Sequence, residues 1–248
     1  MGAELAAIVA AGGTPLVSAR QRDHRFFTSM AVVALLTILI GFGPTYFFTP
    51  FLQPRHITPL VHLHATVFTL WSFLYLAQTS LVAVGRTDIH RRLGVAGAVL
   101  ALVLIPVGFV TAVEAARLGV GPPERDPLKF LSVPLGALPV FAILVGTALW
   151  QRHRSETHKR LMLLATISLL MAAFARMRFI GGGGLPVAMG GTFLLVCVTW
   201  IYDRVAHGRV HPAFLWGGLF IVAMMPIRAL VGMTGPWLVF ARWVTGHP

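Results

Sequence analysis

Long runs of apolar residues, separated by short polar segments, make up most of this chain. Seven runs are long enough for a membrane-spanning helix, which needs roughly 20 residues at about 1.5 Å of rise each. They cover approximately residues 30–50, 58–84, 92–117, 130–150, 160–177, 185–202 and 213–233. The pattern therefore predicts an all-α, polytopic membrane helix bundle. We expect residues 1–29 to be a cytoplasmic segment, 30–233 to form the seven-helix domain and 234–248 to be a short outer tail.

The composition agrees with this pattern. Hydrophobic residues make up 56% of the 248 residues and charged residues only 11%, whereas soluble domains carry about 25% charged residues. No polar stretch is long enough to form a separate soluble domain.

The basic residues indicate an orientation. The net charge is +12, from 20 Lys and Arg against 8 Asp and Glu, and the basic residues gather in every second connecting segment. These are Arg20, Arg22 and Arg25 before the first run, Arg86, Arg91 and Arg92 after the second, Arg152, Arg154, Lys159 and Arg160 after the fourth, and Arg204 and Arg209 after the sixth. The positive-inside rule then predicts an inner N-terminus and an outer C-terminus in a bacterial inner membrane. Membrane lipid is the expected partner of these charges, and nucleic acid is not.

One ten-residue phrase occurs twice. Residues 85–94 read GRTDIHRRLG, and residues 153–162, 68 positions later, read HRSETHKRLM. Each copy lies in an inner turn, at the start of an outward-running helix, where Thr87 and Ser155 are suitable N-caps. The repeat predicts a duplicated helical hairpin, and a weaker echo ends at Pro212, at the expected first turn of the seventh helix.

Each copy of the phrase carries one histidine at the same position, His90 and His158. Two imidazoles at one depth on different helices can hold a haem iron from both faces, and Arg91 and Arg160 can pair with its propionates. The alternative is that each copy is only a well-capped helix start whose arginines contact lipid phosphate.

The same residues carry a family resemblance. His90-Arg91-Arg92-Leu93-Gly94 and His158-Lys159-Arg160-Leu161-Met162, followed by Ala175-Arg176, resemble an uncharacterised family of bacterial multi-pass membrane proteins. That family carries a His-Arg-x-Leu-Gly element and a His-Arg-x-Met element followed by an Arg. It is distantly similar to the cytochrome b-561 superfamily, in which such a histidine is a haem ligand. The resemblance covers about residues 60–180 and implies haem b. Only the second run has histidine at the outer level, so the resemblance does not extend to a second haem.

The second run carries a polar stripe. His64, Trp71 and Gln78 are spaced by seven and share one helix face, which should turn towards the bundle interior. The stripe indicates either hydrogen bonds between helices or the wall of a site for a quinone head group or another cofactor edge.

Further polar residues lie in the outer half. Arg176 and Arg228 fall inside apolar runs, where charges normally face a cavity. With His64 and Glu114 they predict a net positive pocket that opens outward. His56, His62 and His64 can gather around copper or zinc only if the helix begins after them.

Three functions fit these patterns. The first is a redox protein that holds haem b and exchanges electrons with quinone or a partner protein. The second is a non-catalytic subunit that docks lipid or other membrane protein subunits. The third is a transporter-like module that binds an anionic ligand with His64, Arg176 and Arg228.

Overall fold

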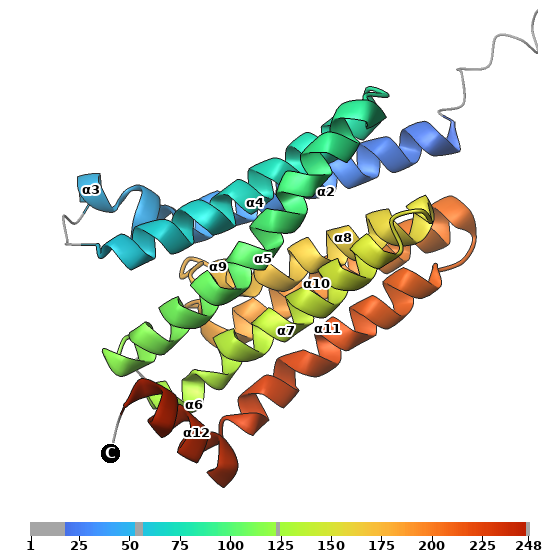
Figure 1. Cartoon of the computed structure of the whole chain (residues 1–248). Coiled ribbons are helices and arrows are strands. Elements are labelled where there is room, and N and C mark those ends of the chain that lie inside the picture. Colours follow the sequence, from blue (N-terminus) through green and yellow to red (C-terminus); the bar gives the residue numbers. More distant parts are fainter. Residues whose placement is uncertain (1–17, 53–56, 123–124, 247–248) are drawn as a thin grey trace, which may run out of the picture.

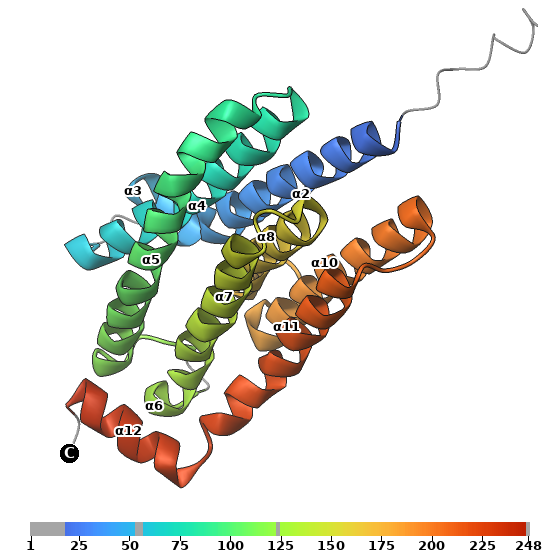
Figure 2. The same cartoon turned by 45° about the vertical axis from the view of Figure 1, so that its right-hand side comes forward.

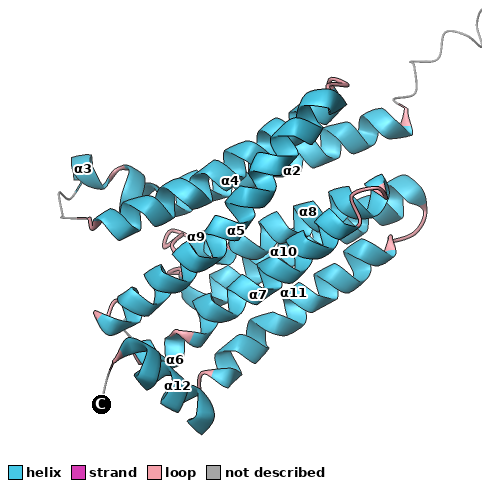
Figure 3. Cartoon of the chain, in the orientation of Figure 1, coloured by secondary structure: helices cyan, strands magenta, loops and turns pink. Residues whose placement is uncertain are grey.

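The computed structural model describes residues 18–52, 57–122 and 125–246, and within these ranges the regular structure is helical throughout (Figure 3). Seven helical segments are long and apolar enough to cross a membrane, so the predicted all-α bundle of seven spans is confirmed. The elements are α2 (Ala19–Phe42), the π-helical turn η1 (Gly43–Phe47), α3 (Thr49–Leu52), α4 (Pro59–Ala83), α5 (Thr87–Arg117), α6 (Pro127–Phe130), α7 (Ser132–Trp150), α8 (Ser155–Leu169), α9 (Met171–Ala175), α10 (Gly184–His207), α11 (Pro212–Val231) and α12 (Gly235–Thr245).

The first helix begins earlier than predicted, and the expected tail contains a helix that the apolar pattern did not predict. Residues 19–29, assigned to the N-terminal segment, belong to α2, because Ser18 and Gln21 form a reciprocal capping box with both hydrogen bonds at 3.2 Å. The expected tail contains α12, which Thr234 caps. Residues 19–29 are more polar than the spans, so hydropathy alone does not reveal the start of α2, and α12 has 11 residues, too few to cross a membrane.

The starts of α5 and α8 also differ in detail from the prediction. Thr87 and Ser155 are the first helical residues rather than the N-caps. Arg86 and Arg154 take the N-cap positions, and neither makes a side-chain capping hydrogen bond. Pro212 opens α11 as expected, behind His211 as N-cap.

The helices pack as antiparallel neighbours. The pairs α4–α5 and α7–α8 each form a tight hairpin, as the repeat predicts, and α2 packs along α4 (Figure 1). The span of α8 and α9 is the most enclosed, with 61% of its apolar window buried against 17% for α5. Figure 2 shows α8 between the group of α2, α4 and α5 and the group of α7, α10 and α11. The core is therefore built around α8.

One end of the bundle collects the basic turns. The start of α2 and the turns at 84–86, 151–154 and 208–211 all lie towards the right-hand side of Figure 1. We call this the basic end. It is the end that the positive-inside rule assigns to the cytoplasm, and α12 lies at the opposite end.

Candidate functional site

The two repeated histidines meet at the basic end. His90 lies in the first turn of α5 and His158 in the first turn of α8, and both are partly buried. Their ring centroids are 6.4 Å apart and the ring planes are inclined at 81°. Arg91, beside His90, is exposed. The duplicated hairpin thus brings its two imidazoles together from separate helices.

The protein fixes the orientation of the His158 ring. Its Nδ1 lies 2.8 Å from the carbonyl oxygen of Ala148 on α7. A carbonyl only accepts hydrogen bonds, so the proton of the neutral ring is on Nδ1 and Nε2 keeps its lone pair. Metal-bound histidines usually have a hydrogen bond of this kind behind them.

Gln78 holds the His90 ring from behind. In the amide orientation that satisfies both of its ends, the nitrogen donates to Nδ1 of His90 at 2.8 Å and the oxygen accepts from the N–H of Gly94 at 3.0 Å. This places the proton of a neutral His90 on Nε2. The reversed amide presents its oxygen to Nδ1 instead, and His90 then has the same tautomer as His158.

The dimensions of the pair suit two ligands of one metal ion. Bonds of about 2.0–2.1 Å from a metal to each imidazole separate the two ring centres by roughly 6–6.5 Å. The observed 6.4 Å lies in this range. This spacing is compatible with two histidine ligands of the expected haem. The ligand tautomer of His90 also requires reversal of the Gln78 amide, which sets the amide nitrogen against the N–H of Gly94.

The polar stripe of α4 faces the interior, as expected. Trp71 is 3% exposed, and its Nε1 donates to Oγ1 of Thr166 on α8 at 3.3 Å. His64 stacks on Phe68 with ring centroids 4.2 Å apart. The Nδ1 of His64 and the hydroxyl of Tyr75 are buried, and neither has a hydrogen-bond partner in the described part of the chain. Sequence reasoning missed Tyr75, although it shares the face of Trp71 and Gln78.

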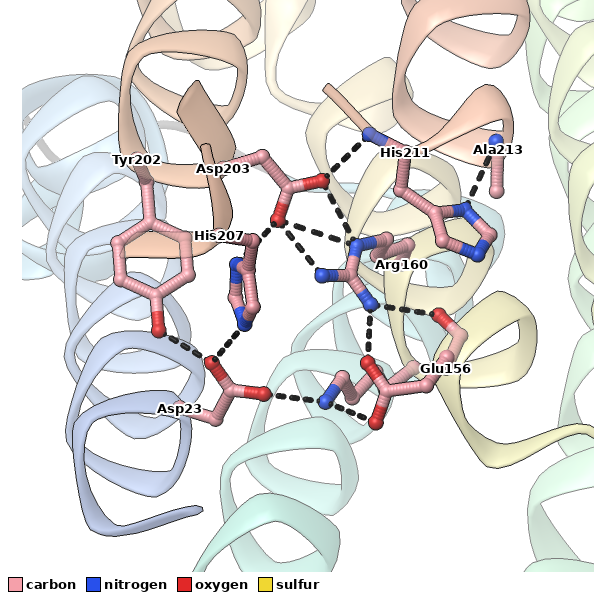
Figure 4. A network of polar contacts seen from close by, with 9 residues as sticks. Asp23, Glu156, Arg160, Tyr202, Asp203, His207, His211 and Ala213 are labelled. Atoms are coloured by element: carbon pink, nitrogen blue, oxygen red, sulfur yellow. Dashed lines mark hydrogen bonds and ion pairs between the residues drawn. The ribbon is translucent and has the colours of Figure 1, made fainter. Parts of the chain in front are cut away.

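Arg160 does not face the histidine pair, so its predicted role beside haem propionates is wrong. It is 2% exposed and donates to Asp203 on α10 at 2.6 and 2.9 Å and to Glu156 at 2.6 Å (Figure 4). The reason is helical geometry: residues two apart point about 200° away from one another. His158 and Arg160 therefore face different neighbours.

A second carboxylate continues this charged network. Asp23 on α2 accepts hydrogen bonds from Nζ of Lys159 at 2.5 Å and from the hydroxyl of Tyr202. Between the two carboxylates lies the His207 ring, with Nε2 3.2 Å from Asp23 and Nδ1 3.3 Å from Asp203 (Figure 4). Both ring nitrogens thus face oxygens that only accept. The apolar runs place the first helix after Asp23, so the sequence pattern does not predict this contact.

His211 closes the network towards α11. Its backbone N–H donates to Asp203 at 2.9 Å, and its Nδ1 accepts from the N–H of Ala213 at 3.1 Å. Burial, together with the nearby charge of Arg160, holds the pKa of His211 below its ordinary value. The neutral ring is the form that can cap α11.

The predicted outer pocket assembles only in part: Arg176 lies close enough to His64 to act on it electrostatically, whereas Glu114 and Arg228 have other partners. Glu114 lies at the surface beside Arg117, with 3.9 Å between their charged groups. Arg176 donates to the carbonyl of Ala172 at 2.8 Å, and its guanidinium lies over the ring of Phe42 at 4.5 Å. Glu114 thus lies beside Arg117, whereas Arg176 lies beside Ala172 and Phe42.

Arg228 is buried at a different place, between α7, α9 and α11. It is 5% exposed and donates to the carbonyls of Met224 at 3.1 Å and Val133 at 3.4 Å and to Sδ of Met171 at 3.0 Å. Its acceptors are neutral, and its stem lies against Gly136, where any side chain would collide with it.

The proposed copper or zinc group lacks the backbone that it requires. His62 and His64 both lie inside α4, about 200° apart around the helix, and Nδ1 of His62 is 2.9 Å from the hydroxyl of Tyr46. His56 lies outside the described residues. Within those residues, no group of three or more His, Cys, Asp or Glu side chains could hold a metal ion.

Comparison of the chain with known protein families, with curated proteins and with solved structures finds no match. The likeness to the cytochrome b-561 superfamily therefore stays a prediction from motifs. The function is therefore inferred from the geometry of the histidine pair and its neighbours.

Proposed function

We propose that this chain is an integral membrane redox protein of the bacterial inner membrane that holds one haem b between His90 and His158. The observation that carries the proposal is the arrangement of the two rings, 6.4 Å apart and nearly perpendicular, on two copies of one hairpin. Bound there, the haem supplies reversible one-electron chemistry at neutral pH. The electrons would pass to or from quinone or a partner protein.

The chain's own contribution is to orient the two ligands. The carbonyl of Ala148 fixes the His158 ring and Gln78 fixes the His90 ring. An acceptor behind a metal-bound histidine sets its tautomer and raises its basicity, and loss of the acceptor commonly weakens metal binding by about 10- to 100-fold. The Ala148 carbonyl is such an acceptor for His158, and the oxygen of Gln78 becomes one for His90 when the amide is reversed. Gln78 and the Ala148 carbonyl are therefore positioning groups for the ligands.

The interior stripe of α4 supports quinone as the electron-exchange partner. The hydroxyl of Tyr75 and Nδ1 of His64 are buried without partners among the described residues, and an unmet polar group of this kind costs about 1–3 kcal/mol. A quinone carbonyl is an acceptor that would satisfy such a donor.

The direct test is the visible absorption spectrum of the detergent-purified protein. We expect a Soret band and a pyridine haemochromogen value near one haem per chain, and we expect both to be lost in His158→Ala and His90→Ala. His153→Ala is the matched control, because His153 lies in the same turn region but is exposed. It should keep the full band.

Two results would count against the proposal. A Soret band that survives in His158→Ala would exclude this residue as a ligand. A colourless wild-type protein that co-purifies with other membrane subunits would favour the non-catalytic role instead.

A further inference from the structure

A hollow of about 400 Å³ opens at the basic end, and its lining includes no residue of the histidine pair or of the charged network. It is lined by Gln21, His24, Arg25, Thr28 and Ser29 of α2 and by Ala83 at the end of α4. The five residues of α2 follow the spacing of successive turns, so they form one face of the helix.

The lining is rich in hydrogen-bond donors and contains no carboxylate. It offers a guanidinium, an imidazole, an amide and two hydroxyls. The nearest acid along the chain, Asp23, points away from this face and is held by Lys159, Tyr202 and His207. A site of this composition favours an anion, and Arg recognises phosphate oxygens through paired hydrogen bonds.

One lining group lacks a partner. The Oγ1 atom of Thr28 is almost inaccessible to solvent and has no hydrogen-bond partner in the described part of the chain. Threonine in a helix can satisfy its hydroxyl on the preceding turn, as Thr37 does on the carbonyl of Val33 at 2.8 Å. Thr28 does not, so its unpaired hydroxyl reaches an acceptor in the hollow once the side chain rotates towards it.

The face that lines the hollow continues as an apolar stripe. Beyond Arg25 and Ser29, the same side of α2 presents Val33, Leu36 and Ile40, of which Leu36 and Ile40 are each 49% exposed. Polar donors at the helix end, followed by exposed aliphatic side chains along the span, match a phospholipid, whose phosphate is followed by acyl chains. A free phosphate ion would use only the first part of this surface.

We propose that the hollow between α2 and the end of α4 is a specific binding site for the head group of an anionic phospholipid. Arg25 and His24 contact the phosphate, Thr28 and Gln21 donate to its oxygens, and an acyl chain lies along Val33, Leu36 and Ile40. This site is independent of the haem proposal, because its residues on α2 and at the end of α4 include neither histidine of the pair nor the groups that orient them.

Native mass spectrometry of the full-length protein, titrated with phosphatidylglycerol or phosphatidylcholine, tests the site. We expect one phosphatidylglycerol to bind more tightly than the rest, and Arg25→Gln and Thr28→Val each to weaken it about tenfold, as for a hydrogen bond to a charged group. Thr28→Val keeps the shape and the charge. Arg92→Gln removes an exposed charge from the same end and should change this affinity less than about twofold.

Four outcomes would overturn the proposal. Equal weakening by Arg25→Gln and Arg92→Gln would show that only general surface charge attracts lipid. Equal affinity for both lipids would remove the role of head-group charge. Displacement of the lipid by inorganic phosphate at similar concentration would identify a free anion as the occupant. A shift of the haem spectrum in Arg25→Gln, with lipid binding unchanged, would assign the hollow to the carboxylates of the cofactor instead.

Discussion

Arg160 and Asp203 show how this protein tolerates charge deep in its helical core. The two side chains are 2% and 0% exposed, and they share hydrogen bonds of 2.6, 2.9 and 3.2 Å. Taking both ions out of water is costly, and their attraction compensates only because Glu156 and the backbone of His211 supply further partners. If either ion were removed, the other would lose its fully buried charged partner, because Glu156 is 55% exposed and the His211 N–H is neutral.

Asp203→Asn should therefore lower the free energy of unfolding by about 3–5 kcal/mol, because it leaves the buried Arg160 opposite a neutral amide. The measurement is thermal or denaturant unfolding in detergent, followed by circular dichroism. Asp88→Asn is the control, since the Arg86–Asp88 pair is more than half exposed on both sides, at 57% and 59%. An equal and small effect of both variants would contradict the importance of burial at Asp203.

A pH dependence follows from His211. Its pKa is lowered in the folded protein by burial and by Arg160, whereas in the unfolded chain it returns to about 6.5. Below that value the unfolded state takes up the proton first, so the contribution of His211 is complete above about pH 6.5 and is lost as the pH falls through the lowered pKa. We expect the unfolding midpoint to fall over this acidic range.

His211→Asn should flatten this part of the pH profile, because asparagine caps a helix but does not titrate. His153→Asn, at an exposed histidine, should leave the slope unchanged. A wild-type slope in His211→Asn would assign the titration to another group.

Single residues also show what the sequence could and could not predict. The meeting of His90 and His158 was predictable because both copies of the phrase place histidine at the same helix position. The partners of Arg160 were not, because they depend on the rotation of α8 relative to α10. The contact of Asp23 was not predictable for another reason. The apolar run begins only at residue 30, whereas the helix begins at Ala19, behind a capping box formed by polar residues.

At the scale of the elements, α8 is the helix on which the others pack. Leu163, Leu164 and Ile167 are fully buried, and one end of the helix carries both His158 and the charged network. The seven spans and the pairing of hairpins followed from apolar runs and the repeat. The close contacts between helices that are not adjacent in the sequence could not be predicted. They depend on which glycine of one helix packs against the backbone of another.

Gly41 tests one such crossing. A Cβ at this position of α2 would overlap the backbone carbonyl of Ala173 on α9, and a rigid backbone cannot yield as a side chain does. Gly41→Ala should lower the free energy of unfolding by about 1–3 kcal/mol. Gly146→Ala in α7, where the new Cβ meets nothing within 4 Å, should be neutral or slightly stabilising because alanine favours the helix. Similar unfolding midpoints for the two variants would refute this close packing.

At the scale of the whole molecule, the two ends of the bundle differ in chemistry. The basic end holds the histidine pair, the charged network and the donor-rich hollow, whereas the opposite end carries Arg228 among neutral acceptors and the short helix α12. A haem between His90 and His158 would lie near the basic end, close to the predicted cytoplasmic surface.

Electron paramagnetic resonance of the oxidised, purified protein at low temperature tests the histidine pair most directly. Axial imidazoles with perpendicular planes leave two iron d orbitals nearly equal in energy, which gives a low-spin ferric signal of large g anisotropy. From the 81° between the rings we predict this signal in the wild-type protein and its loss in His158→Ala. Absence of a low-spin ferric haem signal in the wild-type protein would contradict the account.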